Sequence, residues 1–141
     1  MPPFNSLFKS LFTSSEFAPE HELKLRTWIS RQPQPSISYQ EVRDVVVPPT
    51  NEAVQFGVIY RVHRNNVPKW ALFRCPCNCG AVITLSLQQA HRPRWSLRST
   101  NDDRPSLRPS IWRDTGCLSH FWIEDGRAYF CLDTGYPPPR Y

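Results

Sequence analysis

The chain has no long hydrophobic run among its 141 residues. A membrane-spanning helix needs about 20 consecutive, mostly apolar residues, and no stretch of this sequence approaches that length. The first nine residues also lack the charged segment followed by a sustained apolar stretch that marks a secretory signal. We therefore expect no membrane association and a cytoplasmic location.

Glycine is scarce and proline abundant, with 5 Gly against 15 Pro. Proline removes a backbone donor and fixes φ, so the interiors of helices reject it. This composition excludes a bundle of long helices. The length and the 40% hydrophobic content support one domain with an appended segment and exclude a large multidomain enzyme.

Lysine is also rare, with 3 Lys beside 14 Arg in a chain of formal net charge +5. An arginine-rich domain can bind nucleic acid, because guanidinium groups pair with phosphates and stack on bases. Acidic residues dilute the positive charge of the last third of the chain, however: Asp102, Asp103, Asp114, Glu124 and Asp125. Nucleic-acid binding is thus an alternative that the charge pattern does not favour.

Residues 1–44 differ from the rest of the chain and form a predicted N-terminal extension. Apolar residues recur at three- and four-residue spacing near its start, which predicts a short amphipathic helix: Phe4, Leu7, Phe8, Leu11 and Phe12. A second helix is expected after Pro19. Residues 31–36 contain two prolines and read as a stiff linker.

Residues 45–141 have the residue pattern of a β domain. Runs rich in β-branched and aromatic residues alternate with turn residues, which predicts short strands in residues 45–47, 54–63, 70–74, 81–87, 94–98, 110–113, 118–124 and 127–132. Asp125-Gly126, between two apolar runs, is a strong hairpin signal. We expect a mainly β (α+β) protein, with a compact antiparallel β domain behind the helical extension.

Five cysteines are present, and three of them alternate in Cys75-Pro-Cys77-Asn-Cys79. This spacing disfavours disulfides among the three, and in a reducing compartment it favours a metal. Cys117 follows Gly116 in a second predicted turn. The sequence therefore predicts a structural zinc site that joins two turns and staples the β domain.

The ligand set of this site stays open at the level of spacing. His120, three residues after Cys117, could be the fourth ligand as readily as Cys75. A catalytic zinc is less favoured, because four thiolates would fill the coordination sphere and no His-Glu-x-x-His pattern exists. The remaining alternative is a group of buried free thiols, which behave as small hydrophobes.

The last third of the chain also offers a nucleophile and a base. Serine attacks a carbonyl only when a neighbouring base takes its proton. Ser119 and His120 are adjacent, so in a strand their side chains point to opposite faces. Ser110 precedes His120 by ten residues, a separation that suits two neighbouring strands joined by a turn. Trp95, Trp112 and Trp122 either line a slot beside this pair or belong to the core.

Four segments occur in the order of a known family: Trp70 to Gly80, Arg92 to Trp95, Leu107 to Ile111 and Gly116 to Ile123. Between about residues 48 and 132 the chain resembles small proteins encoded in bacterial ubiquitination-like (Bub) operons. Their operons also encode an E1-like, an E2-like and a ubiquitin-like protein. In this family Cys-Pro-Cys-Gly-Cys-Gly is usual, where this chain has Asn78. Asn tolerates the left-handed conformation, so we expect the turn to be kept.

The resemblance implies a serine protease with a Ser-His dyad that acts on the ubiquitin-like protein at its C-terminal glycine. By motif position, Ser110 would be the nucleophile and His120 the general base, with Ser119 as a reserve nucleophile. If His120 is the base, the zinc must be held by Cys75, Cys77, Cys79 and Cys117. The E1-like and E2-like proteins are further expected partners, and the alternative within this pathway is a non-catalytic zinc-binding adaptor.

Overall fold

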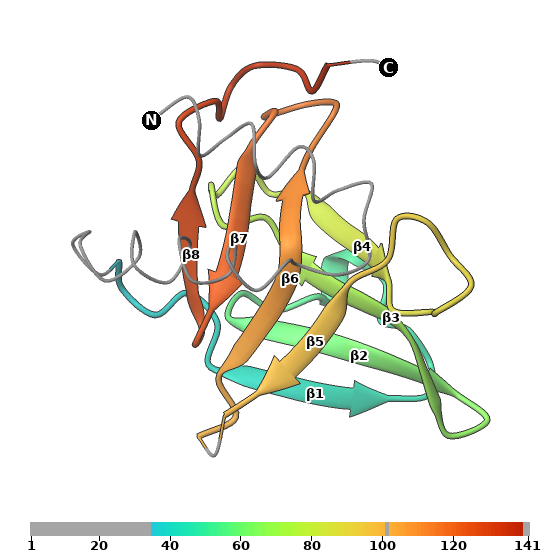
Figure 1. Ribbon diagram of the computed structural model, residues 1–141. Helices are drawn as coiled ribbons and strands as arrows, with labels where there is room; N and C mark the ends of the chain where they lie inside the picture. Colours follow the sequence, from blue (N-terminus) through green and yellow to red (C-terminus); the bar gives the residue numbers. More distant parts are fainter. Residues whose placement is uncertain (1–34, 101, 140–141) are drawn as a thin grey trace.

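Two four-stranded β-sheets make up the part of the chain that the computed structural model describes, residues 35–100 and 102–139 (Figure 1). The first sheet has the order β1-β2-β3-β4, with β1 (Glu41–Val45), β2 (Val58–Arg64), β3 (Val67–Arg74) and β4 (Val82–Ser86). The second has the order β5-β6-β7-β8, with β5 (Ser96–Ser99), β6 (Pro105–Trp112), β7 (His120–Glu124) and β8 (Arg127–Phe130). A short 3-10 helix, η1 (Asn51–Ala53), precedes β2. The prediction of a mainly β protein is confirmed.

The facing sides of the two sheets share one hydrophobic core. Ile59 of β2, Phe73 of β3 and Phe121 of β7 are each 0% exposed and belong to this core. Because successive strand residues point to opposite faces, the core position of Phe121 and Ile123 puts His120 and Trp122 on the other face of the second sheet. Strand alternation therefore separates the packing residues of β7 from its candidate base.

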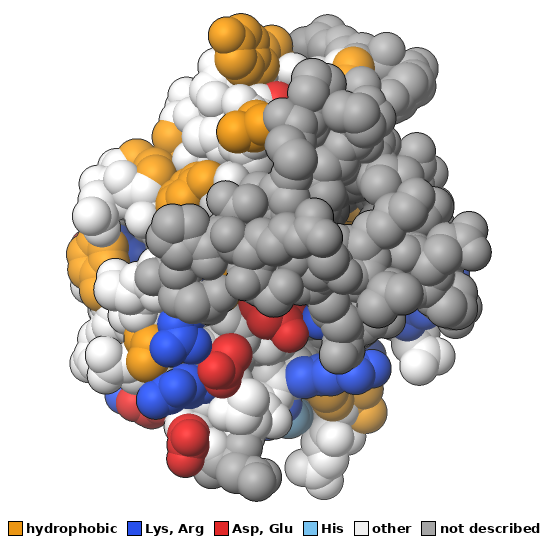
Figure 2. Space-filling view, turned by 60° about the vertical axis from the view of Figure 1, so that its left-hand side comes forward, with side chains coloured by type: hydrophobic (Ala, Val, Ile, Leu, Met, Phe, Trp, Pro, Cys, Tyr) orange, Lys and Arg blue, Asp and Glu red, His pale blue; other side chains and the backbone are white. Residues whose placement is uncertain are grey.

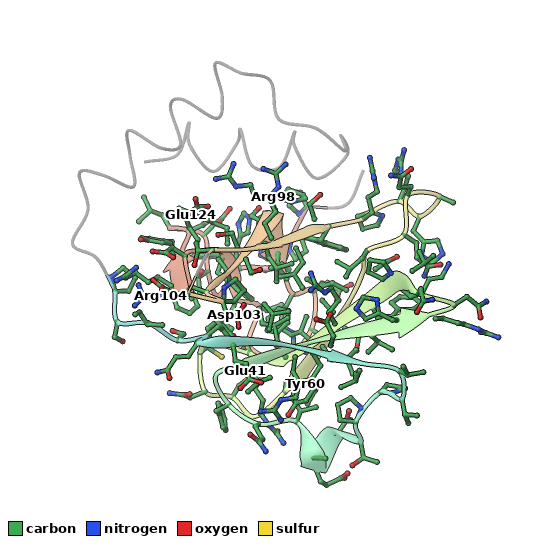
Figure 3. The ribbon with its side chains drawn as sticks, turned by 90° about the horizontal axis from the view of Figure 1, so that it is seen from below. Glu41, Tyr60, Arg98, Asp103, Arg104 and Glu124 are labelled. Carbon is green, nitrogen blue, oxygen red and sulfur yellow. The ribbon has the colours of Figure 1, made fainter. Side chains whose placement is uncertain are left out.

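The two sheets form distinct layers when the molecule is seen from below (Figure 3). Arg98 and Glu124 lie on the layer of β5 and β7, and Glu41 and Tyr60 lie on the layer of β1 and β2. Tyr60 belongs to a second, smaller apolar cluster with Val58 and Val62, away from the shared core. Both faces of β2 are thus packed, which suits its near-continuous apolar run.

One strand pair departs from the predicted antiparallel arrangement. β1 pairs with β2 in parallel, whereas each of the other strand pairs in the two sheets is antiparallel. A parallel pair needs a crossover of about a dozen residues, and residues 46–57, which contain η1, supply that length. The prediction of an antiparallel β domain is therefore wrong at this pair.

The β fold begins before the boundary predicted between residues 44 and 45, which falls inside β1. Ile37 forms an isolated bridge with Arg127, and Tyr39 is 2% exposed in the core. The Tyr39 hydroxyl donates a hydrogen bond of 2.6 Å to the carbonyl of Arg74. The backbone of this segment passes so close to Gly126 that a Cβ there would lie 2.3 Å from the Tyr39 carbonyl oxygen. Glycine is therefore required at position 126 for two reasons: the conformation of the turn and the closeness of the Tyr39 backbone.

The helices predicted for the N-terminal extension lie outside the described residues. Within residues 35–100 and 102–139, no helix has the length and apolar character needed to span a membrane.

Charges of opposite sign lie next to one another on the face shown in Figure 2. Ion pairs among the described residues follow the same pattern: Arg43 with Glu41 at 2.7 Å, Arg108 with Glu124 at 2.8 Å and Arg127 with Asp125 at 3.2 Å. Paired arginines are less available to a phosphate backbone, which needs a patch of one sign.

Candidate active site and metal-ligand cluster

Ser110 occupies an irregular point of β6. The register between β6 and β7 shifts between Leu107 and Ile111, so residues 108–110 stand opposite the single residue Trp122. Such bulges re-aim a side chain, and they tolerate a proline because the ladder is interrupted there. Pro109 is thus accommodated inside a central strand. Trp95 donates its indole N–H to the Ser110 carbonyl at 3.3 Å, which fixes the backbone of the bulge.

His120 is the first residue of β7 and is 0% exposed. Its Nε2 lies 3.1 Å from the hydroxyl oxygen of Ser110. On the neighbouring strand, Trp112 is the register partner of His120 and stacks on its ring, with centroids 4.2 Å apart and planes within 1° of parallel. The Trp112 indole N–H is held in turn by the carbonyl of Tyr136 at 3.0 Å. The imidazole is therefore fixed in a single plane next to the serine.

Asp133 is the third member of this site, and the sequence reasoning missed it. Its Oδ1 lies 2.7 Å from Nδ1 of His120, and its side chain is 22% exposed. The signal that could have found it is the Asp125-Gly126 hairpin, whose register pairs Phe121 with Phe130. Continuing that register by one step brings the chain just after β8 alongside His120.

The turn after β8 wraps around His120. The amide of Cys131 donates to the His120 carbonyl at 2.7 Å, and the Thr134 hydroxyl donates to the same carbonyl at 2.9 Å. The Thr134 amide closes the turn on the Cys131 carbonyl at 3.1 Å. These bonds of the turn position Asp133 beside the imidazole ring. Its place therefore does not depend only on the hydrogen bond between its carboxylate and His120.

The hydrogen bonds define the tautomer of His120. An ionised carboxylate can only accept, so Nδ1 donates to Asp133 and Nε2 is left to accept the Ser110 proton. Burial lowers the pKa of His120 from its ordinary value of 6.5, because it disfavours the imidazolium, while the hydrogen bond and charge of Asp133 act in the opposite direction. The neutral form, which can act as a base, is therefore favoured near neutral pH.

Four cysteines converge from the segment between β3 and β4 and the segment between β6 and β7. The Sγ atoms of Cys75, Cys77, Cys79 and Cys117 all lie within 4.8 Å of one another. Cys75 lies 3.3 Å from Cys77 and 3.7 Å from Cys117. In a tetrahedral thiolate site with bonds of about 2.3 Å, the sulfurs are about 3.8 Å apart. The cluster could hold a metal ion without His120, which is engaged by Ser110 and Asp133.

The loop that carries three of these cysteines has the expected backbone. Asn78 has φ +68° and Gly80 φ +85°, so both adopt the left-handed conformation. Asn78 thus keeps the turn, as expected from its tolerance of this conformation. The Cys75 amide donates to the Ala81 carbonyl at 2.9 Å and closes the loop between β3 and β4.

Groups around the cluster favour thiolates at its exposed side. Burial acts to raise the pKa of Cys117, but hydrogen bonds from Ser119, Cys77 and Cys75 outweigh it, and the pKa is lowered to about 6. Burial raises the pKa of Cys75. Arg113 places Nη1 3.5 Å from the Cys117 sulfur and 3.7 Å from that of Cys79. Its guanidinium supplies positive charge where several thiolates would repel one another.

The remaining candidates take other roles in the structure. Ser119 is 1% exposed and directs its hydroxyl to Cys117 rather than to His120. Trp122 is 1% exposed and stacks on Tyr129, so it belongs to the packed interior and not to an open slot. Trp95 and Trp112 are partly buried and contact Ser110 and His120 directly.

A serine hydroxyl, an imidazole and a carboxylate joined in one hydrogen-bonded series are the arrangement of a serine hydrolase. The family can be stated from comparison with known proteins. A family model described as bacterial ubiquitination-like system serine protease (BubE) matches residues 46–131, more than half of the chain, and the chain belongs to this family. The resemblance noted in the sequence is confirmed. No curated protein and no solved structure matches the chain.

The matched segment contains Ser110, His120 and all four clustered cysteines. Asp133 lies two residues beyond its end. The assignment of Asp133 to the site is therefore based on the geometry of this structure alone.

Proposed function

We propose that the protein is a serine protease that cleaves a ubiquitin-like protein of its pathway after the C-terminal glycine, with Ser110, His120 and Asp133 as its catalytic residues. The observation that carries this proposal is the continuous series from the Ser110 hydroxyl through both nitrogens of His120 to Asp133, at 3.1 and 2.7 Å. Membership of the family described as bacterial ubiquitination-like system serine protease supports a ubiquitin-like protein as the substrate. The E1-like and E2-like proteins of such a pathway are further proposed partners.

Each residue has a defined part in the reaction. Ser110 Oγ attacks the carbonyl carbon of the terminal glycine while His120 Nε2 takes the hydroxyl proton. Asp133 keeps Nε2 free of a proton beforehand and stabilises the imidazolium that forms. The imidazolium then protonates the leaving amine as the C–N bond breaks. Water, deprotonated by His120, hydrolyses the acyl-enzyme and releases the free glycine carboxylate.

The enclosed position of the nucleophile supports glycine at the scissile bond. Ser110 and His120 are both 0% exposed, and two indole rings, Trp95 and Trp112, lie against them. A backbone without side chains reaches such a site more easily than a bulky residue does. A terminal glycine of an extended tail meets this requirement.

We further propose that the four clustered cysteines hold a structural zinc ion. The donor set consists of thiolates that fill all four positions, which is typical of structural rather than catalytic zinc. When bound, the ion would tie the loop between β3 and β4 to the turn before β7. It takes no part in the proton transfers.

Asp133→Asn tests the contribution of the carboxylate. The amide can present its N–H to His120 and so favour the wrong tautomer, in which Nε2 carries the proton. We expect cleavage of the ubiquitin-like precursor to slow by roughly 10²–10⁴-fold with little change in KM. The assay is mass spectrometry of the released C-terminal peptide. Asp102→Asn, an exposed carboxylate in the loop before β6, is the matched control and should cleave at the wild-type rate. Equal rates for both variants would remove Asp133 from the mechanism.

The pH dependence of cleavage tests the state of His120. Only the neutral imidazole accepts the Ser110 proton, so kcat/KM should fall as pH drops through the pKa of His120. Because burial lowers this pKa, the midpoint of the acid limb should lie below 6.5. Removing the opposing influence of Asp133 with Asp133→Asn should move the midpoint lower still. A wild-type midpoint above 6.5 would show that the Asp133 charge outweighs burial.

A further inference from the structure

We propose that His120, Cys131 and Asp133 form a second metal site, which captures a thiophilic divalent cation such as Zn²⁺ or Cd²⁺ and thereby switches the active site off. One ligand atom from each residue lies within 4.8 Å of the other two. The regulatory part of this proposal rests on the proposed protease function. The binding part does not.

The donor set selects the kind of ion. An imidazole, a thiolate and a carboxylate together suit zinc and its soft neighbours, whereas Mg²⁺ and Ca²⁺ prefer oxygen ligands alone. The three residues differ from the four clustered cysteines in number and in leaving a position for water. Cys131 itself takes no part in the four-cysteine cluster.

The turn after β8 holds the three ligands in place before any ion arrives. Cys131 is bound through its amide to the His120 carbonyl at 2.7 Å. The Thr134 hydroxyl accepts from the His120 amide at 3.2 Å and donates to the His120 carbonyl at 2.9 Å. The backbone therefore fixes the spacing of Cys131 and His120. Asp133 lies between Cys131 and Thr134, both of which are bound to His120. Little ordering is left to occur on binding.

An ion can reach the site from the side of Asp133. The Asp133 side chain is 22% exposed, whereas Cys131 is 4% exposed and His120 is 0% exposed. Metal–ligand bonds of about 2.0–2.3 Å require ligand atoms roughly 3.3–3.8 Å apart. Nδ1 of His120 and Oδ1 of Asp133 are now 2.7 Å apart, so the partly exposed carboxylate has to retreat by less than about 1 Å.

Occupation of this site would change the tautomer of the base. The ion binds Nδ1, the thiolate of Cys131 and the carboxylate of Asp133, and the Cys131 thiol proton leaves to solvent. The proton that Nδ1 carried moves to Nε2, so the ring stays neutral. Nε2 then donates to Ser110 and has no lone pair to accept the hydroxyl proton. The nucleophile loses its base without any movement of the strands.

Zinc binding to the full-length, zinc-loaded protein tests the site directly. Isothermal titration calorimetry with ZnCl₂ should show a second equivalent bound to the wild type and to Ser110→Ala, which keeps all three ligands. Cys131→Ala should weaken this second equivalent at least tenfold, and MgCl₂ should produce no binding in any variant. In ¹⁵N NMR of the histidine rings, zinc should move the His120 proton from Nδ1 to Nε2. This spectroscopic shift needs no variant, so it tests the site even if Cys131→Ala folds poorly.

Inhibition is measured on each zinc-loaded variant relative to its own cleavage rate without added zinc. Zinc should inhibit the wild type at the concentrations that fill the second site, and Cys131→Ala should need at least tenfold more. The metal site is refuted if the wild type binds no second equivalent, or if Cys131→Ala binds it equally well. If the second equivalent binds and shifts the tautomer but the protein cleaves no ubiquitin-like precursor, the protease proposal fails and the metal site stands.

Discussion

Ser110→Ala is expected to abolish cleavage of the ubiquitin-like precursor while leaving the fold intact. In the proposed mechanism the hydroxyl is the atom that attacks, and its oxygen lies 3.1 Å from Nε2 of His120. Loss of the nucleophile should lower kcat by about 10⁴-fold or more, because the remaining base and carboxylate cannot form an acyl-enzyme. The side chain is small and fully buried beside its strand neighbours, so alanine fits the same space.

The measurement combines two readouts. Precursor cleavage is followed by mass spectrometry, and covalent labelling by a small fluorophosphonate is mapped to the modified peptide. The wild type should label at Ser110, and Ser110→Ala should neither label nor cleave. Ser119→Ala is the matched control, because Ser119 is equally buried but faces Cys117, and it should keep both activities. Unimpaired cleavage by Ser110→Ala would overturn the assignment. A folded wild type that neither labels nor cleaves would favour a non-catalytic adaptor.

Cys75→Ser is expected to cost the protein its metal and most of its stability. Cys75 is 0% exposed in the shared core and its sulfur lies 3.3 and 3.7 Å from two other cysteines. Structural zinc contributes on the order of 10–16 kcal/mol in small domains, which is comparable to the whole stability of a domain, about 5–15 kcal/mol. A serine here also leaves a hydroxyl in an apolar site. The variant should therefore unfold at a much lower temperature than the wild type.

Zinc content and thermal unfolding by circular dichroism give the measurement. The wild type should carry one tightly held equivalent of zinc, and Cys75→Ser none. Cys131→Ser serves as control, since this cysteine is also buried but lies outside the four-cysteine cluster. It should lose some stability and keep the tightly held zinc. Retention of metal and of the wild-type melting temperature by Cys75→Ser would exclude a four-thiolate site.

The metal-ligand cluster and the active site are close neighbours in the chain. Cys117 precedes His120 by three residues, and Ser119 between them directs its hydroxyl to the Cys117 sulfur. Cys75, Cys77 and Cys79 belong to the loop between β3 and β4 of the other sheet. An ion held by all four would therefore fix the start of β7, where the base lies, to the first sheet. Such a link would let the proposed structural ion stabilise the position of the proposed base.

Local sequence patterns predicted the strands and turns well, because these elements depend on residues that are neighbours in sequence. Alternating apolar residues and the Asp125-Gly126 turn indicated the hairpin that the structure shows as β7 and β8. The strand predicted at residues 110–113 in fact begins at Pro105, because a bulge absorbs Pro109. A bulge depends on the partner strand, so no pattern within β6 alone announces it.

The sequence by itself determined a small, mainly β chain with three alternating cysteines, a fourth cysteine three residues before His120, and a serine and a histidine ten residues apart. These follow from composition, side-chain alternation and short spacings. Only the tertiary structure decided that β1 runs parallel to β2, that His120 is engaged by Ser110 and not by the cysteines, and that Asp133 completes the site. Each of these depends on how strands and turns distant in sequence pack together. Hydrogen-bond geometry between them, rather than residue type, pairs His120 with Ser110 and Asp133 and leaves it outside the four-cysteine cluster.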